Sequence, residues 1–421
     1  MNQAVHSQFS ISKLHNPLTE PASAPRVLRL DDVSYEISEN IATLEPEWCA
    51  FQQHADGTVF QTFEWLATWQ QNIGISRDVR PAVVIGSDPQ GAILFLLPLA
   101  TQPAGFAREL VWLGTELCDY NGPLLAQHFS TEFDVANFVQ LWERIIAALR
   151  QHPRLSFDLI RLEKMPATIG EQPNPMLYLP ASLNPSGAHL IALDSSWDNF
   201  YASKRSSATR RRDRSKRKRL AASGELRFIE PDNHADALLM VQTLIEQKSC
   251  SFARMGVSNF FKRPGYTEFF RAVATDPKMA SVVHISQLNV GEDPAAVNLG
   301  LAFRNRYYYL LASYTDKKGL SRFGPGAAHL RELLQRAIER GFKYFDFTIG
   351  DESYKSDWCN RQLPLYDHIK AHTARGVIAF LSLSVKQRLK RLIKQTPIFW
   401  AVFRQARATK AKLFRNTSCP S

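Results

Sequence analysis

Hydrophobic and polar positions follow two periods along this chain, and the alternation between them predicts strands and helices in mixed order. In the first part, short runs rich in Val, Ile and Leu predict strands, and runs with apolar residues on one side predict helices. The predicted strands are 33–37, 80–85, 93–99, 110–113 and 157–162, and the predicted helices are 44–53, 63–71 and 134–151. Together these elements predict a complete α/β unit over residues 29–165.

A proline-rich stretch, residues 166–188, separates this unit from the next one. Five of the 23 prolines fall between Pro166 and Pro185, so we expect a connection with little regular structure. The pattern then resumes, with predicted strands at 189–193, 226–229, 281–288, 296–303, 307–313, 344–347 and 363–370, and predicted helices at 196–202, 206–222, 235–248, 266–274 and 327–340. A second unit over 189–372 therefore resembles the first in outline, without a residue-level repeat.

The two ends of the chain differ from these units. Residues 1–28 are polar and aperiodic, which predicts a loose arm. Residues 373–421 predict two basic helices broken near Pro397, with apolar positions on one face. This profile is typical of a helix that lies on a membrane surface, and packing against the protein with a solvated basic face is the alternative.

Composition indicates an ordinary soluble globular chain. With 421 residues, 45% hydrophobic and 22% charged, we expect two to three domains. The five cysteines are scattered and contain no C-x-x-C, which favours a reducing compartment over a disulfide framework or a zinc knuckle. No charged segment followed by an apolar run begins the chain, and its apolar runs are shorter than the about 20 residues that span a bilayer. We expect a cytoplasmic protein, with peripheral contact to an anionic inner membrane as an open alternative.

Two basic segments carry the positive charge of the chain. Residues 204–219 hold ten Lys and Arg with Asp213 as the single acid, and residues 381–421 hold ten with no acid. The formal charge is +11, so the rest of the chain carries a net −8. Like charges at i,i+4 along the helix 206–222 repel one another, which favours a nearby polyanion such as phosphates, a lipid-linked sugar, tRNA or a membrane. A solvated helix is the alternative, and the scarcity of aromatic neighbours argues against specific single-strand binding.

A glycine-containing turn supplies the candidate phosphate site. Gly324, Pro325 and Gly326 stand between the predicted strand 307–313 and the predicted helix 327–340. Free backbone N–H groups and the positive helix end bind phosphate at such a place, and we expect Arg322, Gly324, Gly326 and Ala327 to contact the donor. The chain has neither a Walker loop nor the dinucleotide pattern G-x-G-x-x-G at this turn, and a plain strand-to-helix turn is the alternative.

Several segments together resemble a known group of acyltransferases. They are residues 59–65 (VFQTFEW), Leu113-Gly114 with 119–123 (DYNGP), Trp197 and Tyr201, Gly324-Pro325-Gly326, and Phe345-Asp346-Phe347 with Gly350, Tyr354, Lys355 and Trp358. Their order and spacing resemble the GNAT-superfamily acyltransferases of the cellulose-biosynthesis-associated (CelD/BcsL) family, relatives of the Fem peptidyltransferases, over roughly residues 45–370.

The resemblance implies a tandem of two GNAT-like α/β folds, each a mixed, mostly antiparallel sheet flanked by helices. It further implies acetyl-CoA or another acyl-CoA as co-substrate, with no tightly bound cofactor and no metal. The chain departs from the superfamily's Q/R-x-x-G-x-G/A loop, because Ser321 stands at the Arg or Gln position and Arg322 is one place off. Fem-type relatives use aminoacyl-tRNA instead, so that donor stays an alternative.

Acyl transfer requires a base for the acceptor, a stabilised oxyanion and a proton for the leaving thiolate. Candidate bases are Asp119, Asp346, Asp351 and Glu352; Asp346 alternates with Phe345 and Phe347 and is therefore expected to face away from them. Tyr354 is the candidate proton donor, and Lys355 resembles a catalytic lysine of Fem relatives that holds an oxyanion or phosphate. Tyr354 and Trp358 could instead simply pack, and Asp351 and Glu352 could cap a helix. The candidate substrate-binding residues are Tyr120, Lys204, Arg205, Arg211 and Trp358.

These observations predict an acyltransferase that moves an acyl group, most simply acetyl, to an amine or hydroxyl of a sugar or of a cell-envelope or exopolysaccharide precursor. The acceptor would attack in the groove between the two folds, with the basic helix near it. The alternatives are a Fem-like aminoacyl-tRNA-dependent transferase and a non-catalytic module that binds membrane or nucleic acid. No G-x-S-x-G elbow is present, and His368 and His372 have no third metal ligand in the sequence pattern.

Overall fold

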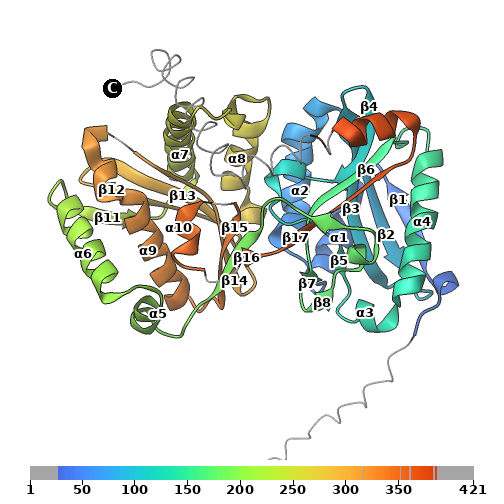
Figure 1. Cartoon of the computed structure of the whole chain (residues 1–421), viewed down its shortest axis with the longest axis horizontal. Helices are drawn as coiled ribbons and strands as arrows, with labels where there is room; N and C mark the ends of the chain where they lie inside the picture. Colours follow the sequence, from blue (N-terminus) through green and yellow to red (C-terminus); the bar gives the residue numbers. More distant parts are fainter. Residues whose placement is uncertain (1–26, 316, 351, 360–361, 383–384, 386–421) are drawn as a thin grey trace, which may run out of the picture.

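Two mixed β-sheets form the centres of two units that lie side by side in the computed structural model (Figure 1). The structure describes residues 27–315, 317–350, 352–359, 362–382 and 385. The predicted N-terminal arm and most of the C-terminal tail lie outside the described residues.

The sheet of the first unit has the strand order β1-β2-β3-β4-β6-β17-β9, and β5 pairs with β3. Its strands are β1 Ser34–Ser38, β2 Arg80–Ser87, β3 Ile93–Ala104, β4 Ala107–Trp112, β5 Leu124–Leu125, β6 Leu159–Pro166, β9 Ser182–Leu183 and β17 Leu365–Ala371. Its helices are α1 Glu45–Gln52, α2 Phe63–Trp69, α3 Phe129–Glu132 and α4 Val135–Gln151. The stripe of buried residues on α4, from Phe138 to Leu149, packs against this sheet.

The sheet of the second unit has the order β11-β12-β13-β14-β15-β10-β16. Its strands are β10 Ala188–Ala192, β11 Leu226–Ile229, β12 Val283–Val290, β13 Asp293–Phe303, β14 Arg306–Tyr314, β15 Tyr344–Ile349 and β16 Gln362–Leu363. Its helices are α5 Trp197–Lys204, α6 Ser207–Ala221, α7 His234–Met255, α8 Tyr266–Thr275, α9 Pro325–Glu339 and α10 Ser353–Ser356. Capping side chains begin α4, α5, α6 and α7, as Ser, Asp or Asn at these positions predicts.

Each unit contains one parallel pair of neighbouring strands among otherwise antiparallel ones in the described sheets. β4 and β6 pair in parallel at two positions only, and β14 and β15 at three, the last of which joins Tyr308 to Asp346. In both units a helix-containing connection links the two parallel strands, α4 in the first and α9 in the second. The prediction of tandem GNAT-like folds with mixed, mostly antiparallel sheets is confirmed.

One continuous hydrophobic core joins the two units. The ring of Trp65 in α2 meets that of Phe269 in α8 edge-on, with 4.9 Å between their centroids. Gly265 is the N-cap residue before α8, with φ 82°, and a methyl group there would overlap the carbonyl oxygen of Asn72 in the first unit. The backbones of the two units therefore approach each other so closely that only glycine fits at this position.

The chain returns to the first unit after it has completed most of the second. β16 pairs with β10 in the second sheet, whereas β17 pairs antiparallel with β6 in the first (Figure 1). The sequence placed 363–370 in the second unit, because the apolar alternation of a strand carries no information about its pairing partner.

Other differences from the predicted elements are local. α7 continues past Lys248 to Met255, where Gly256 ends it with a left-handed conformation. The connection 166–188 contains a small hairpin, β7 Thr168–Ile169 with β8 Gln172–Pro173, in addition to β9. Residues 374–382 of the predicted tail are helical, and the second predicted helix lies outside the described residues. Within the described part of the chain, no helix has the length and apolar character needed to cross a bilayer.

Candidate active site

Asp346 of β15 joins the two units through a buried hydrogen bond. As the alternation predicts, it points away from Phe345 and Phe347, which pack in the core beneath α9. The Tyr120 hydroxyl of the first unit donates to its Oδ1 at 2.7 Å, and the Thr348 N–H donates to the same atom at 2.8 Å. Arg306 Nη1 lies 3.3 Å from its Oδ2. Two residues that the sequence predicted for one site, 226 positions apart, are thus in direct contact.

Burial dominates the electrostatics of this contact. It raises the pKa of Asp346 to about 6, although the charge of Arg306 and the Tyr120 hydrogen bond act in the opposite direction. Burial and the neighbouring Asp346 carboxylate also raise the pKa of Tyr120 well above its ordinary value. Asp346 has no exposed surface, so its carboxylate orients Tyr120 and Thr348 rather than meeting solvent directly.

Asp119 precedes Tyr120 and lies beside the second unit. Burial raises the pKa of Asp119, while Lys164 and a hydrogen bond from the Thr348 hydroxyl act to lower it. Lys355 and Glu352 are the next charges that act on Asp119. Unlike Asp346, Asp119 keeps part of its surface exposed, so it has the better access to an acceptor.

Lys355 and Glu352, which act on Asp119 through their charges, belong to the segment around α10. Lys355 is 3% exposed, and its Nζ donates to the Ile349 carbonyl at 2.9 Å and lies 3.0 Å from Glu352 Oε2. Glu352 occupies the N-cap position of α10, but its side chain makes no capping hydrogen bond. The predicted base Asp351 lies outside the described residues.

Tyr354 and Trp358 occupy different surroundings. Tyr354 packs edge-on against Tyr309 and Phe347, and burial raises the pKa of its hydroxyl. Trp358 is 4% exposed and stacks on Phe200 in the core of the second unit. Both side chains therefore pack, but against different partners: Tyr354 against β14 and β15, and Trp358 against α5.

The start of α9 has the geometry expected of a phosphate site. Gly324 precedes the helix with φ 67°, Pro325 begins it, and no side chain caps its first N–H groups. Arg322 precedes this turn and stacks its guanidinium on the ring of Phe323, 4.7 Å from the ring centroid. Ala327 is exposed in the first turn of α9, so an anion at this end of the helix would lie against it.

The basic helix α6 lies beside this turn and not beside the inter-unit contact. It packs against Lys317–Phe323, the short helix before Gly324, and it occupies the outer side of the second unit (Figure 1). The expectation that α6 lies near the inter-unit groove is therefore corrected: its position is next to the candidate phosphate site. Arg211 is exposed on this helix.

Lys204 and Arg205 belong to the end of α5, on the same side. Arg205 lies 3.2 Å from Asp357 and 3.8 Å from Asp213, and its guanidinium covers the Trp358 ring at 5.1 Å. These contacts hold α5 and α6 to the segment after α10. A cavity of about 470 Å³ lies between α5, α6 and α9, lined by Trp197, Tyr201, Asp213 and the charged side chains of α6 and α9.

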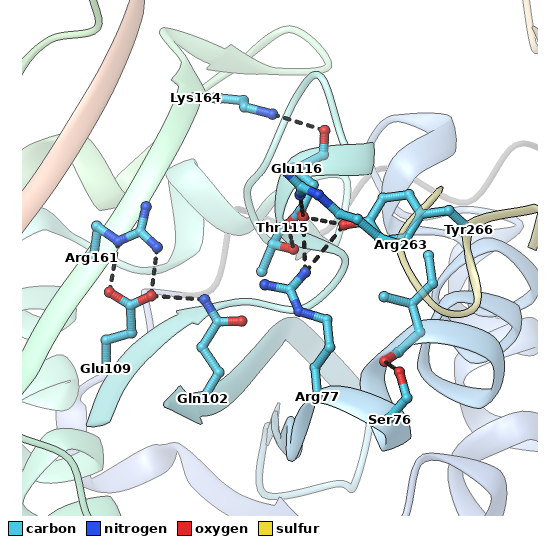
Figure 2. A network of polar contacts seen from close by, with 11 residues as sticks. Ser76, Arg77, Gln102, Glu109, Thr115, Glu116, Arg161, Lys164, Arg263 and Tyr266 are labelled. Carbon is cyan, nitrogen blue, oxygen red and sulfur yellow. Dashed lines mark hydrogen bonds and ion pairs between the residues drawn. The ribbon is translucent and has the colours of Figure 1, made fainter. Parts of the chain in front are cut away.

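A smaller cavity, of about 140 Å³, lies in the first unit where β4 and β6 separate. Its lining includes Arg161, Glu163 and Lys164 of β6. Glu116 also lines it. Arg77 of the first unit and Arg263 of the second lie 2.8 and 3.1 Å from the Glu116 carboxylate (Figure 2). Burial would raise the pKa of Glu116, but hydrogen bonds from Thr115 and Tyr266 and the charge of Arg77 lower it to about 2. Glu116 is therefore ionised at neutral pH and links the units through charge.

Four residues of these sites were not predicted. Arg306 stands in a predicted turn, Thr348 has φ 59°, which is rare for a β-branched residue, and Lys164 donates to the Cys118 carbonyl at 2.8 Å, next to Asp119. Lys248, in α7, lies near the charges of Glu352 and Lys355, which act on its pKa in opposite directions. In the sequence, Lys248 could have been noticed as a polar residue on the apolar stripe of a helix. No comparable pattern marks the other three residues.

Comparison with known proteins adds a family to this geometry. Residues 207–356 match the family described as "Acetyltransferase (GNAT) domain". No curated protein sequence matches the chain.

Among solved structures, FemX is similar with a TM-score of 0.53 and 12% identity, over 77% of this chain and 96% of FemX. A conserved protein of unknown function from Bacteroides thetaiotaomicron has a TM-score of 0.48 and 13% identity, over 79% of this chain and 99% of that one. The C-terminal domain of a putative lysylphosphatidylglycerol synthetase from Agrobacterium fabrum has a TM-score of 0.48 and 11% identity, over 82% and 97%. Residues 207–356 of the second unit therefore match a GNAT acetyltransferase domain, within an overall fold similar to that of FemX.

Proposed function

We propose that this protein transfers an acyl group, most simply acetyl, from acyl-CoA to an amine or hydroxyl of a sugar or cell-envelope precursor. The observation that carries the proposal is the extent of the GNAT match. Residues 207–356 include the uncapped start of α9, the parallel pair β14–β15, Asp346 and Lys355, so the matched segment contains the part of the candidate site that the second unit supplies.

In this proposal the second unit binds the donor and the first unit binds the acceptor. The donor phosphates bind the free N–H groups at the start of α9, where Gly324 and Gly326 allow close approach. The acceptor approaches from the first unit, and Asp119 accepts its proton, since a raised pKa makes this carboxylate a stronger base. The 140 Å³ cavity supplies polar groups for the acceptor. Lys164, which lines it, acts to lower the pKa of Asp119. Assignment to the CelD/BcsL family, and with it an exopolysaccharide precursor, is part of this proposal.

Acetyl-CoA binding tests the donor directly. A ligand at about 100 times its Kd stabilises the folded protein by about 2.7 kcal/mol, which raises the Tm measurably. We expect acetyl-CoA or a longer acyl-CoA to raise the Tm, and wild-type protein to release free CoA thiol when amino sugars are added. Absence of a Tm shift with every CoA thioester would contradict the proposal.

The position of α6 favours a second candidate donor, an aminoacyl-tRNA. Exposed arginines, among them Arg211 and Arg212, follow α6 directly beside the candidate phosphate site. In this case charged tRNA would bind in a gel-shift assay, the affinity would fall steeply with salt, and Arg211→Glu with Arg212→Glu would abolish binding. Binding of acetyl-CoA with no tRNA shift would decide for the first candidate.

We also propose peripheral contact with an anionic membrane through the helix 374–382. Ala379 packs against Ala107 and Leu159 of the first unit, which leaves Val377, Ile378 and Leu381 47%, 59% and 56% exposed on other sides of the helix. The sequence that follows adds ten Lys and Arg without an acid between residues 381 and 421. Co-sedimentation with anionic but not with neutral vesicles, lost in Ile378→Asp, would support this contact, and equal recovery with both vesicle types would exclude it.

A further inference from the structure

Two lysines donate to the strands β14 and β15 where these strands are no longer paired with each other. The last β14–β15 pair joins Tyr308 to Asp346. Beyond it, Lys248 Nζ donates to the Ala312 carbonyl of β14 at 2.9 Å, and Lys355 Nζ donates to the Ile349 carbonyl of β15 at 2.9 Å. Beyond the point where β14 and β15 stop pairing with each other, each strand therefore carries an ammonium group on a backbone carbonyl.

The position of Lys248 on its helix is unusual for a lysine. α7 buries Val241, Leu244, Ile245 and Phe252 against the second sheet and α8, and Lys248 stands on the same stripe, four residues from Leu244 and from Phe252. An apolar side chain at this position would continue the core, so the lysine costs stability that packing alone does not explain.

The two lysines differ in their ionic partners. Lys355 forms an ion pair with Glu352 at 3.0 Å. Among the residues that the structure describes, no carboxylate lies within ion-pair distance of Lys248, and its other close contact is the Phe252 ring, 5.7 Å from Nζ. Burial lowers the pKa of Lys248, and of the nearby charges Glu352 opposes this and Lys355 adds to it. Its ammonium group thus gives up a proton more readily than that of an ordinary lysine, whereas burial makes the Tyr354 hydroxyl a weaker acid.

We propose that Lys248 is a catalytic residue of the acyl transfer, and that its ammonium group lies against the thioester and protonates the leaving thiolate. This inference rests on the proposed function. The acceptor nitrogen or oxygen attacks the carbonyl carbon, a new C–N or C–O bond forms, and the C–S bond breaks with its electron pair going to sulfur. Sulfur takes the proton from Lys248 Nζ to give CoA thiol, and the proton of the acceptor goes to Asp119. Asp119 then releases its proton to water and Lys248 takes one from water, which restores both groups.

Two substitutions separate this role from a structural one. Lys248→Arg keeps the positive charge and the donor to Ala312, but a guanidinium does not release a proton near neutral pH. Lys248→Met keeps the length of the side chain without the charge. Lys278→Met is the matched control, because Lys278 is 60% exposed and pairs with Glu45 at the surface.

We expect the kcat of CoA thiol release with acetyl-CoA to fall about 100-fold or more in both Lys248 variants at pH 7, since general acid catalysis contributes about 10²–10⁴-fold. The KM for acetyl-CoA is expected to stay within about threefold, and Lys278→Met to match the wild type. The wild-type kcat should also fall at alkaline pH as Lys248 loses its proton, and Lys248→Arg should lack this fall, which a purely structural role would not produce.

The outcomes are separable. If the wild type transfers acetyl groups and Lys248→Arg is as active, the inference is wrong and the proposed function stands. If the wild type transfers no acyl group from any CoA thioester, both fall. Should thermal melts show that Lys248→Met does not fold, the kcat and pH profile of Lys248→Arg decide alone.

Discussion

Replacement of Asp346 by Asn tests whether ionisation of this buried carboxyl group, which contacts both units, lowers the free energy of unfolding. The Asn carbonyl can still accept from Tyr120 and from the Thr348 N–H, and it has nearly the same shape as the carboxylate. What changes is the charge, which in the wild type has no contact with solvent.

The structure gives the size of the effect. Burial raises the pKa of Asp346 from an ordinary 3.8 to about 6, and a difference of about 2 between pKa values corresponds to about 3 kcal/mol. Because the folded protein holds this proton more tightly than the unfolded chain does, the stabilisation is complete below pH 3.8 and is lost as pH rises through 6. Between pH 4.5 and 7.5 the expected loss is about 2 kcal/mol.

Urea unfolding of wild type and Asp346→Asn at both pH values measures this loss, because groups common to both proteins cancel in the difference. We expect the wild type to lose about 2 kcal/mol more than the variant between pH 4.5 and 7.5. Tyr120→Phe is the control that keeps the charge: it should raise the pKa of Asp346 further and enlarge the pH dependence. An identical pH dependence in wild type and Asp346→Asn would refute the reasoning.

Three further substitutions test the phosphate site and the contact between the units. Ala327→Asp places a negative charge in the first turn of α9, which favours the helix by about 0.5 kcal/mol but repels a phosphate. The KM for acetyl-CoA should therefore rise about 10-fold in Ala327→Asp and stay unchanged in Ala327→Asn. Equal KM values in the two variants would show that this turn does not bind the donor. Gly265→Ala should lower the free energy of unfolding by about 3 kcal/mol or more, because backbone strain and overlap with Asn72 add. Gly341→Ala is the control: Gly341 has φ 77° and open space around it, so this variant should lose about 1 kcal/mol in thermal unfolding. Equal losses would contradict the close approach of the two units. The Glu116 pKa of about 2 predicts a contribution to stability that is present above pH 4.5 and is lost as pH falls towards 2. Glu116→Gln should therefore reduce the acid-induced loss of stability by about 1 kcal/mol after solvent screening. An unchanged acid transition would argue against a charged contact between the units at Glu116.

Local chemistry in the sequence was sufficient for most of the fold. Asn233 and Asp134 mark helix starts that the structure confirms, and the strand 226–229 was predicted with its observed bounds. These features depend on neighbours within a few residues, which the sequence displays directly. The partner of β17 could not be predicted in this way, since the apolar alternation of this strand fits an edge of either sheet equally well.

The candidate site shows the same limit. Alternation on β15 placed Asp346 on the correct face, and the Gly-Pro-Gly turn was found at an uncapped helix start. The position of α6 was misjudged, because a row of arginines indicates attraction to an anion but not on which side of the sheet the helix lies. Lys248 was not among the predicted site residues, because the predicted helix ended at this position, whereas α7 continues to Met255 and places Lys248 between Leu244 and Phe252 on its buried side.

The return of the chain into the first unit has a consequence for its synthesis. β6 obtains its neighbour β17 only after residues 365–371 have left the ribosome, so the first unit waits with an exposed strand edge while some 200 residues are added. During that interval a second nascent chain offers the same pairing. A fragment that stops at residue 188 would keep this edge permanently, and its yield would be limited by self-association rather than by the stability of its core.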